Sequence, residues 1–125
     1  MVDDSESDRL FIVDTVNIEF EQAVIDQASD GRSAFLKVEA NYIEGIRYDM
    51  IFMDMNMNDY DGRAGINMIR LFEKRNKIVK PTAICAVSGD DFGDNTDLAS
   101  LGVVFKLKKP ITLPILRLIL KKTVK

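Results

Sequence analysis

The chain has 125 residues, of which 46% are hydrophobic and 30% charged, a composition typical of one soluble globular domain. Its formal net charge of −3 provides no basic field for nucleic acid, so we expect no nucleic-acid partner. The chain contains no histidine, which excludes histidine-dependent catalytic triads and phosphohistidine chemistry of its own. Any histidine that the function needs must come from a partner.

The N-terminal segment 1–8 carries four acids and almost nothing apolar, and we predict that it is a disordered arm on a single domain spanning 1–125. We expect no membrane insertion, because no apolar run approaches transmembrane length and no signal-peptide pattern is present. The single cysteine, Cys85, cannot form an internal disulfide and lies in an apolar run. These features favour a cytoplasmic domain, free or within a larger membrane-bound protein.

Short apolar runs bounded by Gly, Asp, Asn or Ser predict five core strands. The first four are Leu10–Val13, a weaker Ala23–Gln27, Met50–Met53 and Ala83–Val87, and the fifth is Val103–Leu107. Each run is too short for a helix of average length. A buried parallel strand typically reads as such a continuous apolar run.

Helical patterns alternate with these strands. They cover Ser33–Glu44, Arg63–Arg75 and Leu113–Lys122, and a short helix is expected at Asn95–Ser100. Strand–helix alternation predicts a doubly wound α/β sandwich of three layers around a five-stranded parallel sheet. Only Val16–Gln22 separates the first two predicted strands, whereas a crossover usually needs about a dozen residues. We therefore expect the first helix to be short or absent, unless residues are missing there.

Chemistry-bearing residues stand where the predicted strands end: Asp14, Asp54, Ser88 and Lys109. Open α/β sheets bind ligands at the carboxyl ends of their strands, so these side chains should meet in one crevice. Two neighbouring carboxylates attract a hard cation such as Mg²⁺. A carboxylate can then attack phosphorus while the lysine and the hydroxyl hold the phosphoryl oxygens. The pattern predicts a site for forming an aspartyl phosphate.

Four motifs carry a family resemblance. They are GRSAFLKV at 31–38, YDMIFMDMNMNDYDG at 48–62, AVSG at 86–89 and LKKPI at 107–111. In this order and at this spacing the chain resembles the response-regulator receiver domains, especially those of eukaryotic hybrid histidine kinases. The resemblance implies the flavodoxin-like receiver fold and, at the Lys109–Pro110 bond, the cis isomer that is common in this family.

The resemblance also implies roles for individual residues. Asp54 would be the phospho-acceptor, and Mg²⁺ would be held by Asp14, by Asp54 and by the backbone carbonyl of Asn56. Lys109 would pair with the phosphoryl group. Ser88 would bind a phosphoryl oxygen and move when the domain switches.

Three positions depart from the family pattern. Thr15 stands where the resemblance places a second acid, which should weaken Mg²⁺ binding. Asn58 replaces the usual proline of the acceptor loop. Lys106 occupies the position of the switch aromatic, with Phe105 beside it, and an alternating strand would put these two side chains on opposite faces.

Two functions follow from these observations. The first is a phosphorelay signalling module that takes a phosphoryl group onto Asp54 from a histidine kinase or a histidine phosphotransfer protein, as a monomer or weak dimer. At most it would catalyse its own phosphorylation and dephosphorylation. The alternative is a pseudo-receiver that binds proteins independently of phosphorylation. A phosphohydrolase of the haloacid dehalogenase type fits less well, because Asn56 replaces its second acid and Lys109 follows the acidic segment 89–94.

Overall fold

The computed structural model describes residues 1–55, 62–89 and 96–123. Asn56 and Asn58, which carried two of the sequence expectations, lie outside the described residues. The elements in chain order are α1 (Glu6–Glu19), α2 (Gly31–Ile43), β1 (Met50–Asp54), α3 (Gly62–Arg75), β2 (Ala83–Ser88), α4 (Thr96–Ser100), β3 (Val103–Lys108) and α5 (Leu113–Thr123).

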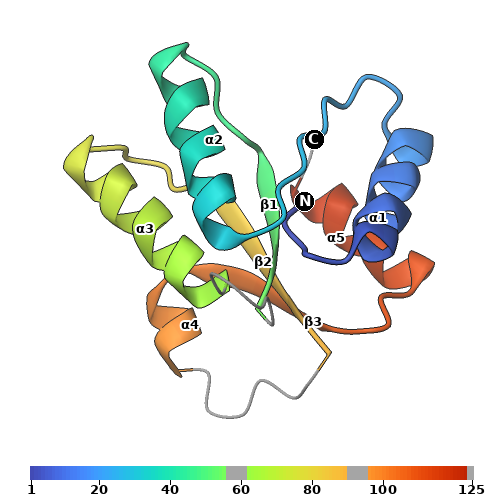
Figure 1. Ribbon diagram of the computed structural model, residues 1–125. Coiled ribbons are helices and arrows are strands. Elements are labelled where there is room, and N and C mark those ends of the chain that lie inside the picture. The colour runs from blue at the N-terminus through green and yellow to red at the C-terminus, as the bar shows by residue number, and fades with distance from the viewer. Residues whose placement is uncertain (56–61, 90–95, 124–125) are drawn as a thin grey trace.

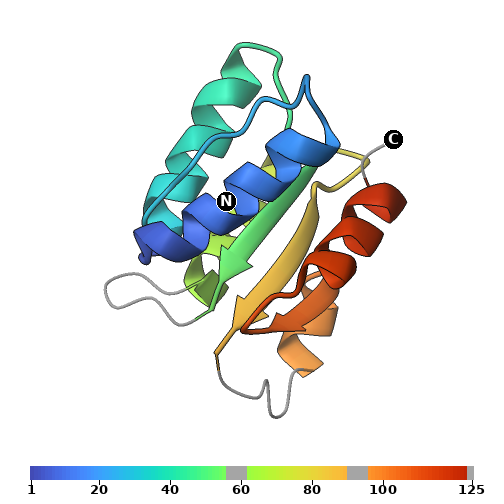
Figure 2. The same ribbon diagram turned by 90° about the vertical axis from the view of Figure 1, so that its right-hand side faces the viewer.

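The described elements form three layers. The sheet lies in the middle, α2 and α3 cover one face, and α1 and α5 cover the other (Figure 1). The strands β1, β2 and β3 are parallel and paired in that order, so their carboxyl ends reach the same end of the molecule (Figure 2). This arrangement confirms the predicted doubly wound α/β sandwich.

Two short extended segments continue the sheet beyond β1. Val2 bridges Met53 on one side and Ala28 on the other, both in the parallel direction. The Val2 amide donates to the Phe52 carbonyl at 2.8 Å, and the Asp3 amide donates to the Ala28 carbonyl at 3.1 Å. The order across the sheet is therefore Ala28, Val2, β1, β2 and β3, which gives five parallel positions.

Each face of the sheet has its own apolar core because residues alternate between faces along each strand. Toward α2 and α3 the buried residues are Val2, Ala28, Ala34, Ile51, Met53, Ile66, Ile69 and Ile84. Toward α1 and α5 they are Ile12, Phe52, Cys85, Val87, Leu116, Ile119 and Leu120. The central strand β2 is buried from Ile84 to Ser88, which explains its continuous apolar run.

The prediction of a first strand at Leu10–Val13 is wrong, since this segment lies in the middle of α1. Ile12 is buried at 2% exposure, whereas Leu10 and Phe11 are both 43% exposed. The apolar run is thus one helical turn with a single residue facing the core. The first helix has 14 residues, so the expectation that it would be short or absent is also wrong.

The segment 1–8, expected to be a disordered arm, is built into the domain. Val2 is 4% exposed and Asp3 is fully buried. Glu6 begins α1, and the side chain of Ser5 caps this helix by accepting a hydrogen bond from the Asp8 amide. The first sheet segment is so short that its only buried apolar residue is Val2, and an apolar run could not reveal it.

The last strand, β3, lies at the edge of the three-stranded sheet and carries a bulge. Ile84 pairs with Val103 but Cys85 pairs with Phe105, so Val104 is the extra residue. Phe105 packs against the core facing α1 and α5. Lys106 is exposed, and alternation places it on the face opposite Phe105.

At the amino end of the sheet, a cavity of about 750 Å³ separates the segment 20–28 from the start of β1. Its wall is mainly apolar and includes Phe20, Val24, Ile46 and Met50. Val24 and Ile46 are also largely exposed, at 89% and 51%. This part of the molecule is therefore packed much less tightly than the region around β2.

A buried carboxylate lies at the same end of the sheet. Glu73 of α3 is 5% exposed and accepts hydrogen bonds from Arg70 at 2.7 Å and from the Thr82 amide at 2.8 Å. Arg47 approaches the same carboxylate at 3.7 Å. Arg70 also donates to the carbonyls of Thr82 and Leu101, which ties α3 to the start of β2 and to the entry of β3.

No helix among the described residues is long and apolar enough to cross a membrane.

Candidate functional site

Asp54 is the last residue of β1 and is 1% exposed. Its amide donates to the carbonyl of Val2 at 2.9 Å, and the next amide, that of Met55, donates to the carbonyl of Val87 at 2.8 Å. These bonds continue the sheet ladder on both sides and fix the carboxylate at the carboxyl edge. Gly62 packs so closely behind it that a Cβ there would lie 2.2 Å from the Asp54 carbonyl oxygen.

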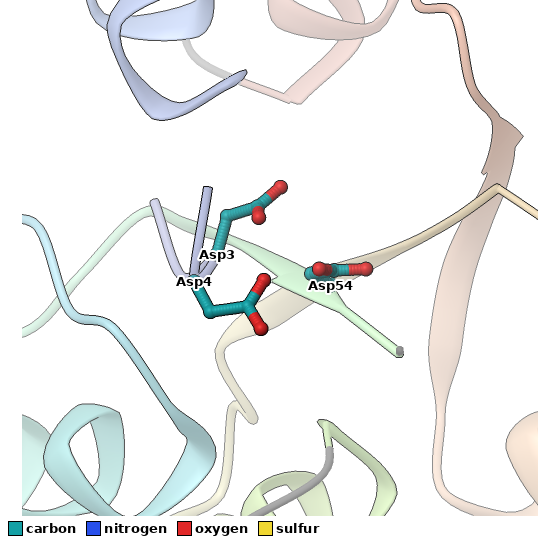
Figure 3. A group of neighbouring side chains, drawn as sticks. All are labelled: Asp3, Asp4 and Asp54. Atoms are coloured by element: carbon teal, nitrogen blue, oxygen red, sulfur yellow. The ribbon is translucent and has the colours of Figure 1, made fainter. Parts of the chain in front are cut away.

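Two further acids stand beside Asp54. Asp3 and Asp4 follow Val2, the residue that pairs with Met53 of β1, and Figure 3 shows both side chains next to the end of this strand. One carboxylate oxygen from each of Asp3, Asp4 and Asp54 lies within 4.8 Å of the others. Asp3 and Asp54 are buried and Asp4 is exposed, so the group opens to solvent on one side.

Lys109 brings a cation to these acids from the loop after β3. Its ammonium nitrogen lies 2.9 Å from Oδ2 of Asp3, 2.9 Å from Oδ2 of Asp8 and 3.6 Å from Oδ2 of Asp54. The Lys109 amide donates to the Ser88 carbonyl at 2.7 Å, which anchors the loop to β2. The Lys109–Pro110 bond is cis, as the resemblance implied.

The surroundings of Lys109 favour its charged form. Partial burial alone would lower the pKa of the ammonium, but the hydrogen bonds that it donates to Asp3 and Asp8 and the charge of Asp54 outweigh burial. The pKa of Lys109 is therefore raised above its ordinary value. The lysine remains a fixed positive charge at physiological pH, able to hold an anionic group at Asp54.

Ser88 closes β2 and is 4% exposed. In the sheet register Asp54 lies opposite Val87, so Ser88 is one position further toward the carboxyl edge. Its partner in β3 is Lys108, the residue directly before Lys109. The structure thus gathers Asp54, Ser88 and Lys109 at one edge, as the sequence pattern predicted.

Asp14 does not join this group. It is an exposed residue within α1, because the strand expected to end at Asp14 does not exist. Thr15, taken as the replacement of a second acid, is buried in the same helix and donates its hydroxyl to the Phe11 carbonyl at 2.9 Å. The consecutive acids expected after the first strand are present, at Asp3 and Asp4.

Asp3, Asp4 and Asp8 are the residues that the sequence reasoning missed. Two local signals point to them. Val2 followed by two consecutive acids is a very short strand end, and Ser5 followed three residues later by Asp8 has the spacing of a helix N-cap. The acidic composition of this segment is also typical of a disordered arm, and on that basis the segment was not predicted to be a strand and a helix N-cap.

The carboxylate group has the chemistry of a Mg²⁺ site. Mg²⁺ prefers oxygen ligands and is held in proteins by one or two carboxylates together with water. Asp3, Asp4 and Asp54 offer three carboxylates, two of them buried, with an exposed side through which water can complete the coordination. The described residues therefore fit this ion.

These features define a class of protein: a doubly wound α/β domain with an acidic pocket and a lysine at the carboxyl edge of its sheet. Residues 1–121 match the family model described as the response regulator receiver domain. The chain belongs to the response regulator receiver family, whose members act in two-component signalling.

Individual relatives agree with this assignment. The chain is 36% identical over 96 residues to the osmosensing histidine protein kinase SLN1 of Saccharomyces cerevisiae. The match covers 77% of this chain but 8% of that protein, so the chain spans a small part of its curated relative.

Solved structures resemble the fold. Chemotaxis protein CheY4 of Vibrio cholerae has a TM-score of 0.76 at 24% identity, covering 98% of this chain and 94% of that one. A two-component response regulator from Cytophaga hutchinsonii has a TM-score of 0.81 at 22% identity, covering 98% of this chain and 92% of that one. At these identities the comparison establishes the flavodoxin-like receiver fold.

Proposed function

We propose that this domain accepts a phosphoryl group on Asp54 from a phosphohistidine of a histidine kinase or a histidine phosphotransfer protein. The observation that carries the proposal is the position of Lys109, whose ammonium lies between buried carboxylates and within 3.6 Å of Asp54. A fixed ammonium beside a buried carboxylate is suited to a residue that must gain negative charge.

In the proposed reaction a carboxylate oxygen of Asp54 forms a bond to phosphorus. The bond between phosphorus and the imidazole nitrogen of the donor breaks, and the imidazole leaves after taking up a proton. Lys109 and the Ser88 hydroxyl hold the phosphoryl oxygens as charge redistributes.

The residues that would hold Mg²⁺ are Asp3, Asp4 and Asp54. When bound, the ion would neutralise part of the phosphoryl charge and lower its repulsion by the carboxylates. The metal-binding role predicted for Asp14 is not part of this proposal, since Asp14 lies within α1. The backbone of Asn56 remains an expected ligand outside the described residues.

Two of the three arguments for a phosphorylation-independent pseudo-receiver lose their basis. They rested on Thr15 in the place of an acid and on a shortened first crossover, whereas Asp3 and Asp4 supply the acids and α1 has 14 residues. Lys106 at the switch position is the remaining argument, and it concerns the output rather than phosphoryl acceptance.

The test is intact mass spectrometry after incubation with acetyl phosphate and Mg²⁺. We expect the parent chain to gain one phosphoryl group and the Asp54→Asn variant to gain none. A parent that stays unlabelled while a known receiver is labelled in parallel would overturn the proposal and favour the pseudo-receiver.

A further inference from the structure

Asp8 makes a contact with Lys109 that the proposed reaction does not require. The ammonium lies 2.9 Å from Oδ2 of Asp8, the same distance as from Asp3, whereas Oδ2 of Asp54 is 3.6 Å away. The contacts with Asp8 and Asp3 are hydrogen bonds, whereas the 3.6 Å separation from Asp54 is too long for a hydrogen bond. In this structure the lysine is therefore hydrogen-bonded to Asp3 and Asp8, whereas it forms only a longer ion pair with the expected phospho-acceptor.

The two neighbours hold Lys109 from different sides. Asp3 is fully buried and its other oxygen accepts a hydrogen bond from the Ser5 amide at 2.8 Å, so it belongs to the fixed part of the site. Asp8 lies in the first turn of α1 and its side chain is 47% exposed. Asp8 thus draws the ammonium toward the solvent side of the site.

We propose that Asp8 is a positioning residue that sets the resting position of Lys109 and competes with the phosphoryl group for it. The inference rests on the proposed function and deepens it. A phosphoryl group adds strong acceptor oxygens and about −1.5 to −2 charge to the site. Its closest contact with the ammonium requires Lys109 to move from Asp8 toward Asp54, so the Asp8 carboxylate opposes phosphorylation and shortens the life of the phosphorylated state.

The first test is the Asp8→Asn variant, which keeps the shape of the side chain and removes its charge. We expect faster labelling by acetyl phosphate and an aspartyl phosphate that lasts about threefold longer, the size of effect typical of a partly exposed ion pair. Asp8→Glu retains the carboxylate and should return both rates toward those of the parent. Glu6→Gln removes an exposed acid from the same helical turn and is the matched control for long-range charge.

The second test needs no phosphorylation rate. A double-mutant cycle of Asp8→Asn and Lys109→Met, followed by urea unfolding, measures the coupling between the two side chains. We expect a favourable coupling in the resting protein, and a smaller one when Mg²⁺ and beryllium fluoride, a stand-in for the phosphoryl group, are added. A purely structural contact would show the same coupling in both states.

The outcomes separate the two proposals. An unlabelled parent overturns the proposed function and this inference together. A labelled parent whose Asp8→Asn variant has the same phosphate lifetime as Glu6→Gln overturns the inference alone. A coupling of zero in the resting protein, or one that beryllium fluoride leaves unchanged, also overturns it.

Discussion

Buried carboxylates lie at both ends of this sheet, in two clusters that differ in composition and in exposure to solvent. The carboxyl-end cluster consists of Asp3, Asp8 and Asp54, whose carboxylates lie within 3.6 Å of the Lys109 ammonium. The amino-end cluster consists of Glu73, Arg47, Arg70 and Thr82, with two cations around one acid.

The two clusters differ in how fully their carboxylates are enclosed by partners that the structure describes. The carboxylate of Glu73 is fully engaged by arginine and by a backbone amide, so this cluster is closed. At the carboxyl end, one carboxylate oxygen from each of Asp3, Asp4 and Asp54 lies within 4.8 Å of the others, and Asp4 is exposed. Carboxylates held this close repel one another, so a bound cation would stabilise this cluster.

The largest expected effect is at the amino-end cluster. Glu73→Ala should destabilise the protein by about 3 kcal/mol, because it leaves Arg70 and the Thr82 amide without their buried acceptor. The measurement is the free energy of unfolding in urea. Glu44→Ala, which removes an exposed glutamate after α2, is the control and should change stability by less than about 0.5 kcal/mol. Equal effects of both variants would contradict the structural role of this cluster.

At the carboxyl-end cluster, Lys109→Met should cost about 2 kcal/mol, because Asp3 and Asp54 lose a nearby cation while buried. The loss should depend on pH in a defined direction. The pKa of Lys109 is raised by folding, so its stabilisation is complete below the ordinary lysine value and is lost as pH rises through the folded value. Urea unfolding of parent and variant should therefore converge only in strongly alkaline solution.

Asp54→Asn should change the free energy of unfolding in the opposite direction to Lys109→Met. Removing one of the clustered acids should stabilise the resting protein by about 1 kcal/mol, since it relieves repulsion among the three neighbouring carboxylates. Mg²⁺ should raise the Tm of the parent through linkage and raise that of the variant less. Thermal unfolding with and without Mg²⁺ checks both statements. Destabilisation by Asp54→Asn would show that the Asp54 carboxylate, like that of Glu73, stabilises the resting fold.

The smallest effect is expected outside both clusters. Arg117 of α5 and Glu19 of α1 form an ion pair of 2.5 Å with an arginine side chain that is 47% exposed. Arg117→Gln should cost about 0.5 kcal/mol, because exposed ion pairs gain little over solvated charges. A loss of stability close to that of Glu73→Ala would mean that burial does not determine how much an ion pair contributes to stability in this protein.

The sequence predicted the secondary-structure elements correctly where the local hydrophobic pattern and the tertiary environment agree. Predicted strands at Met50–Met53 and Ala83–Val87 match β1 and β2 within one residue, because both are central strands covered on both faces. The predicted helices Arg63–Arg75 and Leu113–Lys122 match α3 and α5 in the same way. Asp54 directly follows the predicted strand Met50–Met53, and Lys109 lies just after the predicted strand Val103–Leu107, so both could be placed at strand ends from the sequence.

The N-terminal part failed because its signals are weak or ambiguous. One turn of α1 contains four consecutive apolar residues, Leu10–Val13, and such a run cannot be assigned to helix or strand by periodicity alone. Because a strand was predicted at Leu10–Val13, the acid expected at the end of the first strand was assigned to Asp14. Asp3 is held in the site by pairing of its neighbours with Ala28 and Phe52, contacts that are distant in sequence.

The cavity beside β1 predicts which part of the fold undergoes local unfolding most readily. Protein segments that bury little apolar surface exchange their amide hydrogens through small local openings, whereas central strands exchange only when the whole domain unfolds. The segment that includes Val24 and the start of β1 border this cavity, while β2 lies between two packed cores. Amides of the amino half of β1 should therefore exchange long before those of β2, so we expect β1 to open from the end opposite to Asp54.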